Sequence, residues 1–228
     1  MDERHIRAWA KDKHNQKLVV DTLFSSYKPQ RNKVAIFMAG IPGAGKTEFA
    51  TNTLMAIPGF MPIEHDALVE YIHGYEPANY YSFRSAGSTL VTKVFENCLK
   101  EGYDFIFDGT LTSDQSHHNI QKTLAKGYKV NIMYILQDRT AAWELTQARE
   151  LVKKRSIEPD GFVKSCQKIH ANLLQIFSAH KTDPHFSFWV IDKRFITTDP
   201  DAKLILHNEK ADHSKEIEEL LSNEYGTM

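Results

Sequence analysis

A glycine-rich segment between residues 40 and 47 constrains the fold of this chain more than any other feature. It fills every fixed position of the pattern G-x-x-x-x-G-K-[ST], with the sequence Gly40-Ile41-Pro42-Gly43-Ala44-Gly45-Lys46-Thr47. The apolar run Val34–Ala39 before it has the character of a buried strand, and a helix can begin behind it. Glycines let backbone amides turn inward around a phosphate, and a helix N-terminus adds the positive end of its dipole. The segment therefore predicts a nucleotide-binding phosphate loop between a strand and a helix.

The residues at the end of this loop carry specific chemistry. In a loop of this type Lys46 reaches the β- and γ-phosphates, and the hydroxyl of Thr47 ligates Mg²⁺. Glu48 continues the loop into the helix, and we assign it with residues 40–47 to the nucleotide-binding set. We expect ATP as the nucleotide, with GTP as an alternative, and Mg²⁺ as the metal.

Short apolar segments alternate with helical patterns along the rest of the chain. Runs typical of strands occur at 60–64, 104–107, 128–136 and 186–191, and helical periodicity is clearest over 85–100. This alternation indicates βαβ crossovers. It predicts an α/β chain with three layers, in which a mainly parallel sheet is flanked by helices.

The length of 228 residues suits one domain with additions at its ends. We divide that single domain, 1–228, into an N-terminal helical extension, a core, and a C-terminal part, which are residues 1–32, 33–192 and 193–228. The extension is predicted to be one helix over 2–27. The C-terminal part is predicted to be a small hairpin, which pairs 195–196 with 204–206, followed by a helix over 212–223.

Composition excludes several classes of protein. The formal net charge of -1 gives no electrostatic case for binding nucleic acid, and no apolar run reaches the length of a membrane span. The N-terminus lacks the apolar region of a secretory signal, so we expect a cytoplasmic protein. The 11 histidines and 2 cysteines show no zinc spacing, and no nucleophile-elbow pattern of a serine hydrolase is present.

Two aspartates follow directly after predicted strands. Carboxyl ends of parallel strands meet at one edge of a sheet, so Asp66 and Asp108 are expected near the phosphate loop. Asp66 is either a catalytic base or an N-cap of the following helix, and the residues alone favour neither role over the other. Asp108 suits Mg²⁺ coordination through water, or is a turn residue before Gly109.

Arginines on a later helical segment are candidates for stabilising transferred charge. Arg149 and Arg155 belong to this segment, although most such residues only solvate a helix face. The same segment carries an apolar stripe that we predict to pack inward, formed by Ala141, Leu145, Ala148 and Val152.

An ordered set of segments resembles the zeta toxin family of P-loop kinases. The resemblance covers roughly residues 33–192 and is carried by five segments in the family's order. They are Met38–Thr47, Ile63–Asp66, Gly102–Thr110, Ala125–Val130 and Arg149–Arg155.

The resemblance implies a P-loop kinase-like fold and ATP-dependent phosphorylation of a hydroxyl on a small molecule. The best-described members act on UDP-N-acetylglucosamine, and some have an antitoxin protein as partner. By position, Asp66 matches the family's catalytic base, and Arg149 and Arg155 resemble its lid arginines. Asp108 matches a substrate-contacting acidic position that is more often glutamate, which leaves the acceptor open.

We therefore interpret the chain as a Mg-ATP-dependent kinase of a small metabolite, with a nucleotide sugar as the leading acceptor. Asp108, Gly109 and Thr110 form the predicted acceptor contacts, and Thr47 with Asp108 forms the metal set. A polynucleotide-end kinase is the second hypothesis and is disfavoured by the net charge. A nucleotide-dependent binding switch with little turnover is the third.

Overall fold

A six-stranded sheet lies at the centre of the computed structural model, which describes residues 2–54, 58–153, 158–194, 204–208 and 211–223. The strand order is β2-β3-β1-β4-β5-β6. The strands are β1 (Val34–Ala39), β2 (Met61–Glu64), β3 (Phe105–Asp108), β4 (Lys129–Leu136), β5 (Phe186–Asp192) and β6 (Leu204–His207). β1 to β5 are parallel and β6 is antiparallel to β5, which confirms the mainly parallel sheet.

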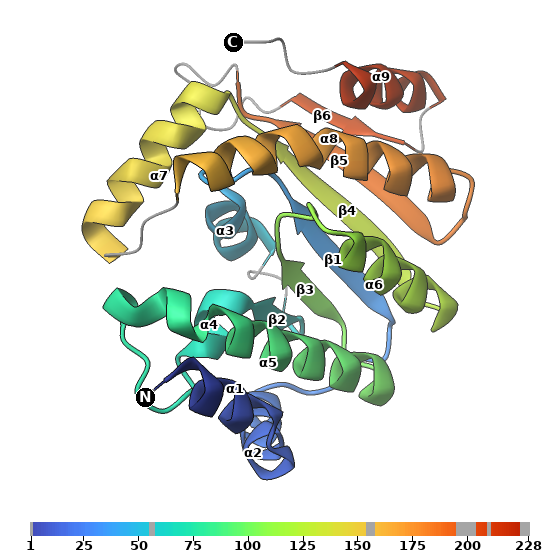
Figure 1. Cartoon of the computed structure of the whole chain (residues 1–228). Helices are drawn as coiled ribbons and strands as arrows, with labels where there is room; N and C mark the ends of the chain where they lie inside the picture. The colour runs from blue at the N-terminus through green and yellow to red at the C-terminus, as the bar shows by residue number, and fades with distance from the viewer. Residues whose placement is uncertain (1, 55–57, 154–157, 195–203, 209–210, 224–228) are drawn as a thin grey trace.

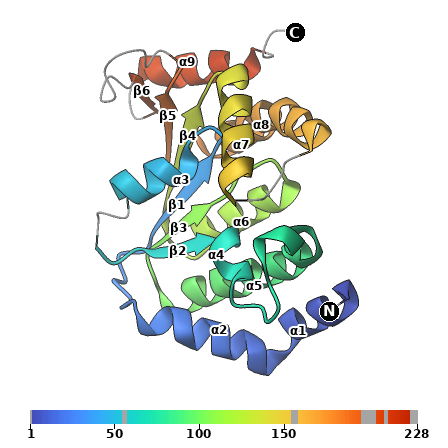
Figure 2. The ribbon, with the colours of Figure 1, turned by 90° about the vertical axis from the view of Figure 1, so that its left-hand side faces the viewer.

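Helices cover both faces of the sheet. The α-helices are α1 (Glu3–Lys11), α2 (Lys13–Ser25), α3 (Lys46–Phe49), α4 (His65–Val69), α5 (Tyr80–Glu101), α6 (Asp114–Ala125), α7 (Arg139–Lys153), α8 (Pro159–His180) and α9 (Ala211–Ser222). A π-helical turn at Ala50–Leu54 continues α3, and a 3-10 turn at Pro77–Asn79 leads into α5. α5, α6 and α8 lie over one face and α3 lies over the other, as Figures 1 and 2 show. The predicted three layers are therefore present.

The sheet register places the ends of the central strands together. β1 lies between β3 and β4, with Phe37 paired to Phe107 on one side and to Ile132 on the other. Glu64 at the end of β2 is paired with Asp108 at the end of β3. The phosphate loop, the start of α4 and the end of β3 consequently meet at one edge of the sheet.

Aromatic side chains fill the core under this edge. Phe37 contacts Phe105 and Phe95 with ring centroids 5.8 and 6.5 Å apart, in edge-to-face arrangements. All three rings are at most 2% exposed. Burying each such side chain contributes roughly 1.5–3 kcal/mol, so this cluster holds α5 against β1 and β3.

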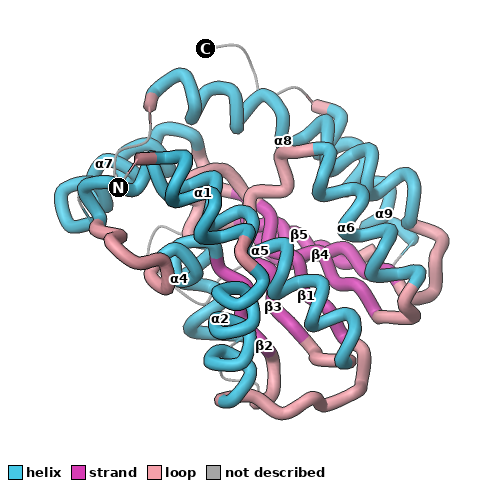
Figure 3. The backbone as a smooth tube through the Cα atoms, turned by 60° about the horizontal axis from the view of Figure 1, so that its bottom comes forward, coloured by secondary structure: helices cyan, strands magenta, loops and turns pink. Residues whose placement is uncertain are grey.

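The N-terminal extension departs from the prediction of one helix. It forms two helices, because Asp12 ends α1 and its side chain accepts a hydrogen bond from the Asn15 amide at 3.0 Å, which begins α2. Ile6 and Ala10 on α1 are fully buried. Both helices pack against α5, and Figure 3 shows the three side by side.

The C-terminal part also differs from the prediction. β6 pairs with β5, with Val190 opposite Leu206, so the antiparallel pair uses the last core strand. The predicted strand 195–196 lies outside the described residues. α9 packs against β6 and α8, which confirms a final helix. No helix in the described ranges is long and apolar enough to cross a membrane.

Candidate active site

Three glycines give the phosphate loop its shape. Gly40, Gly43 and Gly45 have φ angles of 149°, 77° and 83°, a backbone region that residues with a side chain rarely adopt. A Cβ on Gly43 would lie 2.0 Å from the carbonyl oxygen of Ala142 and 2.6 Å from Oγ1 of Thr146. Only glycine fits there, and the close approach brings α7 directly against the loop.

Lys46 lies under the loop with its charge turned toward the backbone. Its Nζ donates hydrogen bonds to the carbonyl oxygens of Gly40 at 3.0 Å and Ile41 at 2.9 Å. Burial lowers the pKa of Lys46 to about 8, with a smaller lowering from Arg149, and the carboxylate of Asp108 opposes the shift. The ammonium is thus costly to bury in the absence of an anion, and a phosphate group would stabilise it.

This pKa shift predicts a pH-dependent affinity for ATP. Below pH 8 Lys46 is charged and ready to meet the phosphates, whereas above pH 8 the free protein must first take up a proton. The apparent dissociation constant should therefore rise by about tenfold between pH 7 and pH 9. Calorimetric titration at fixed Mg²⁺ measures it, and an affinity that stays constant over this range would contradict the assignment.

Thr47 and Asp108 meet across the loop. The Thr47 hydroxyl donates to Oδ2 of Asp108 at 2.9 Å. Burial raises the pKa of Asp108, and the nearby charge of Lys46 and the Thr47 hydrogen bond oppose that rise. A hydroxyl and a carboxylate are oxygen donors of the kind that Mg²⁺ prefers, and Mg²⁺ commonly uses one or two protein ligands beside phosphate and water. The pair therefore fits a magnesium ion, and its side-chain contact supports this use of Asp108 over a simple turn residue.

Asp66 lies in the first turn of α4 and points between the guanidinium of Arg149 and the imidazole of His65. The alternative that it caps the helix is wrong, because the N-cap of α4 is Glu64. Oδ2 of Asp66 lies 3.7 Å from Nη2 of Arg149, and Oδ1 lies 3.6 Å from Nδ1 of His65. The Asp66 side chain is 27% exposed, so a substrate hydroxyl can reach it.

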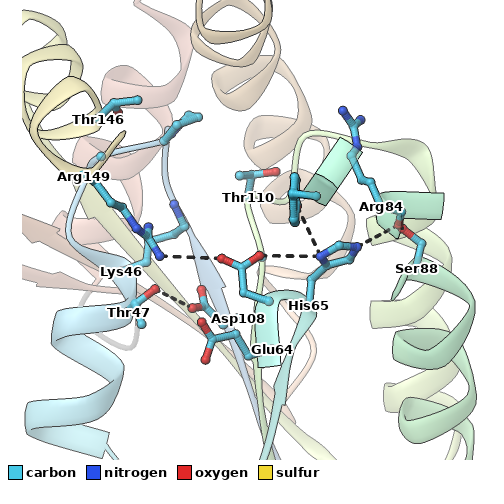
Figure 4. A pocket seen from close by; sticks show the side chains of 15 residues that line it. Lys46, Thr47, Glu64, His65, Arg84, Ser88, Asp108, Thr110, Thr146 and Arg149 are labelled. Carbon is cyan, nitrogen blue, oxygen red and sulfur yellow. Dashed lines mark hydrogen bonds and ion pairs between the residues drawn. The ribbon is translucent and has the colours of Figure 1, made fainter. Parts of the chain in front are cut away.

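A cavity of about 350 Å³ joins these groups (Figure 4). Many of the site residues predicted from sequence line this cavity in the described part of the chain. They are Pro42, Gly43, Lys46, Thr47, Asp66, Asp108, Gly109, Thr110 and Arg149. The predicted loop residues Gly40, Ile41, Ala44, Gly45 and Glu48 lie outside this lining. Arg155 lies outside the described residues, so its predicted role stays a prediction.

The individual residues of the facing wall of the cavity were not predicted. Tyr80, Arg84 and Ser88 line it from α5. His65 contacts Tyr80 and Arg84 on one side and Asp66 on the other. Their four-residue spacing places the three α5 side chains on one helix face. That signal was missed because α5 begins at Tyr80, whereas the prediction began the helix at 85.

A further lysine lies beside the loop. A Cβ on Gly45 would be 2.4 Å from Nζ of Lys193, so the Lys193 ammonium lies against the loop backbone. Lys193 follows β5, and its amide donates to the Leu136 carbonyl at 2.8 Å. In the sequence, the only signal for this position of Lys193 is that it closely follows a predicted strand.

The packing face predicted for α7 is wrong. Leu145 is 50% exposed and Ala148 is also exposed, whereas Ala142 and Thr146 are buried. The side chain of Val152 lies outside the described set. The inward face of α7 is selected by its contact with Gly43, and this rotation directs Arg149 into the cavity.

The phosphate loop directly follows β1 of the parallel sheet. Two carboxylates and an arginine lie beside it, where the strands end. These features define a nucleotide-binding protein with a P-loop kinase-like fold. A sequence model of the zeta toxin family, described as "Zeta toxin", matches residues 19–209. The chain belongs to this family.

Solved structures share the fold at low sequence identity. One belongs to the PezAT chromosomal toxin–antitoxin system of the human pathogen Streptococcus pneumoniae, with 18% identity, a TM-score of 0.60, and coverage of 79% of this chain and 76% of that one. Another is AvrRxo1-ORF1:AvrRxo1-ORF2 with ATP, with 14% identity, a TM-score of 0.62, and coverage of 99% and 74%. No curated protein sequence matches the chain.

Proposed function

We propose that this protein transfers the γ-phosphoryl group of ATP to a hydroxyl of a small molecule. One observation carries the proposal. Asp66 lines one cavity together with Lys46 and Thr47 on the phosphate-binding side and Arg84 and Ser88 on the α5 wall, and its two carboxylate oxygens contact Arg149 and His65. A carboxylate between a phosphate site and a second subsite is placed to accept a proton from an incoming hydroxyl.

Each residue then has a defined role in direct in-line transfer. Loop amides and Lys46 hold the phosphates, and Arg149 neutralises charge that develops on the transferring group. Asp66 accepts the hydroxyl proton. Thr47 and Asp108 would hold Mg²⁺, which when bound neutralises phosphate oxygens.

The acceptor subsite lies between α5 and the loop after β3. Gly109 and Thr110 line it together with Tyr80, Arg84 and Ser88. Hydroxyl groups and an arginine suit a polar acceptor that carries oxygen atoms and negative charge. Family membership makes UDP-N-acetylglucosamine the first compound to test.

Steady-state ADP formation with and without acceptor tests the proposal. Acceptor-stimulated ADP formation together with a phosphorylated acceptor is the expected result. Tight ATP binding without turnover would instead identify a nucleotide-dependent switch. Efficient labelling of oligonucleotide 5′ ends, with no phosphorylation of sugar nucleotides, would identify a polynucleotide-end kinase.

Arg149→Ala should lower kcat more than it weakens ATP binding. Charge on the transferring group is largest in the transition state, so kcat should fall at least about tenfold while the ATP dissociation constant changes little. Arg7→Ala is a matched control, because Arg7 forms an exposed ion pair with Glu3 at 3.1 Å and does not line the cavity. Equal kcat in both variants would assign Arg149 to a solvated helix face.

An antitoxin partner is a further proposal from the comparisons. The PezAT structure belongs to a toxin–antitoxin system, and the AvrRxo1 structures contain two proteins. Affinity purification of this chain from its own cells, with mass spectrometry of bound proteins, tests for such a partner. Recovery of a stoichiometric protein that blocks ADP formation supports it, and recovery of the chain alone contradicts it.

A further inference from the structure

His65 directly precedes Asp66 and has contacts on both of its ring nitrogens. Nε2 lies 2.9 Å from the carbonyl oxygen of Arg84, and Nδ1 lies 3.4 Å from the Tyr80 hydroxyl. Nδ1 also lies 3.6 Å from Oδ1 of Asp66, and the His65 side chain is 23% exposed. Figure 4 shows the His65 ring beside Arg84 and Ser88 of α5. The imidazole thus joins the acceptor wall to the proposed base.

The Arg84 contact determines which nitrogen of His65 carries hydrogen. A carbonyl oxygen only accepts hydrogen bonds, so Nε2 is the donor. Nδ1 is consequently the atom that faces Asp66 and Tyr80. It accepts from the phenol when the ring is neutral, and it donates toward the carboxylate when the ring is charged.

Gly87 makes the space that this arrangement needs. A Cβ on Gly87 would lie 2.7 Å from Nε2 of His65 and 2.3 Å from Cγ1 of Val69. Glycine weakens a helix interior relative to alanine, yet it occupies a middle turn of α5. The glycine lets α4 approach α5 closely enough for the ring to reach the Arg84 carbonyl.

We propose that His65 is the positioning residue for Asp66, an inference that rests on the proposed function. The charged ring of His65 donates from Nδ1 toward Oδ1 of the carboxylate, while Oδ2 faces Arg149. The carboxylate is thereby oriented to take the proton of the acceptor hydroxyl. The acceptor oxygen bonds to the γ-phosphorus, the bond to the bridging oxygen breaks, and ADP leaves.

Three substitutions separate this role from a structural one. His65→Ala removes the contacts of both ring nitrogens, His65→Gln keeps an amide that can reach the Arg84 carbonyl, and His65→Asn keeps an amide near the position of Nδ1. ADP formation from ATP, with a small-metabolite extract as the acceptor pool, gives kcat and the KM for ATP. Melting temperatures show whether each variant folds, and His14→Ala on the exposed face of α2 is the control.

We expect His65→Ala to lower kcat by about 10-fold to 10²-fold with little change in the KM for ATP, since misplacing a reacting group by about 1 Å costs this much. His65→Asn should recover most of the turnover, and His65→Gln should stay low. Full activity in His65→Ala, or better recovery in His65→Gln than in His65→Asn, would overturn the inference.

Failure of the proposed function is distinguishable from failure of this inference. If wild-type protein forms no ADP with the extract, this result contradicts both the proposed function and the role inferred for His65. If Asp66→Asn loses turnover while His65→Ala keeps it, only the role of His65 falls.

Discussion

Replacing Lys46 by alanine is expected to remove ATP-dependent turnover while the protein stays folded. The ammonium is buried beneath the loop, where Asp108 favours its charged form, and its contact with the phosphates is strongest as charge moves to the leaving oxygen. We expect kcat/KM to fall by at least about 10². Because burial makes the charged lysine costly, the melting temperature without nucleotide should not fall.

The matched control for this variant is Lys164→Ala, which removes an exposed lysine from α8. ADP formation and calorimetric ATP binding are measured for both variants. Unchanged ATP binding and unchanged ADP formation in Lys46→Ala would contradict the assignment of residues 40–47 as a phosphate loop. A loss of turnover that only accompanies unfolding would leave the catalytic role of Lys46 without support.

Asp66→Asn should reduce acceptor phosphorylation by about 10² or more while ATP affinity stays near that of wild type. The amide keeps the size of the side chain but is a poor proton acceptor, and general bases contribute on this scale. Removing the negative charge also loosens the contact of Arg149 with Oδ2, which is 3.7 Å in the wild type. The measurement is acceptor-dependent ADP formation under saturating ATP.

Asp160→Asn is the control for this change. Asp160 is exposed and lies in the first turn of α8, and Asp66 likewise lies in the first turn of its own helix, α4. If Asp66→Asn keeps its specific activity and loses only thermal stability, Asp66 serves the helix and another residue must act as the base. Loss of turnover with an unchanged melting temperature supports the proposed role.

Much of the fold could be predicted because local signals agree with the tertiary structure. The run Val34–Ala39 becomes β1 with the predicted bounds, since an apolar run before a phosphate loop has one stable place in a parallel sheet. Predictions were wrong where a local helix cap or a long-range strand pairing overrides the apolar pattern. Asp12 divides the N-terminal helix, and β6 pairs with β5 because that strand presents a free sheet edge.

The residues of the candidate site also include some that were predicted from sequence and some that were not. The loop motif and the strand ends located Lys46, Thr47, Asp66 and Asp108, because those positions depend on sequence spacing. The α5 wall, with Arg84, was missed because the predicted helix began at residue 85, and which face of α5 meets the cavity depends on how the helix packs. The face of α7 was predicted from apolar spacing, but its contact with the loop glycines decides which side turns inward.

The most direct test of phosphoryl transfer is mass spectrometry of a metabolite extract incubated with Mg-ATP and either wild-type protein or the Asp66→Asn variant. We predict that wild-type protein converts at least one small metabolite into a product heavier by one phosphate, with matching ADP formation, and that Asp66→Asn does so at least about 10²-fold more slowly. ATP binding by the wild-type protein without any phosphorylated metabolite, or equal product from the two proteins, would contradict the account.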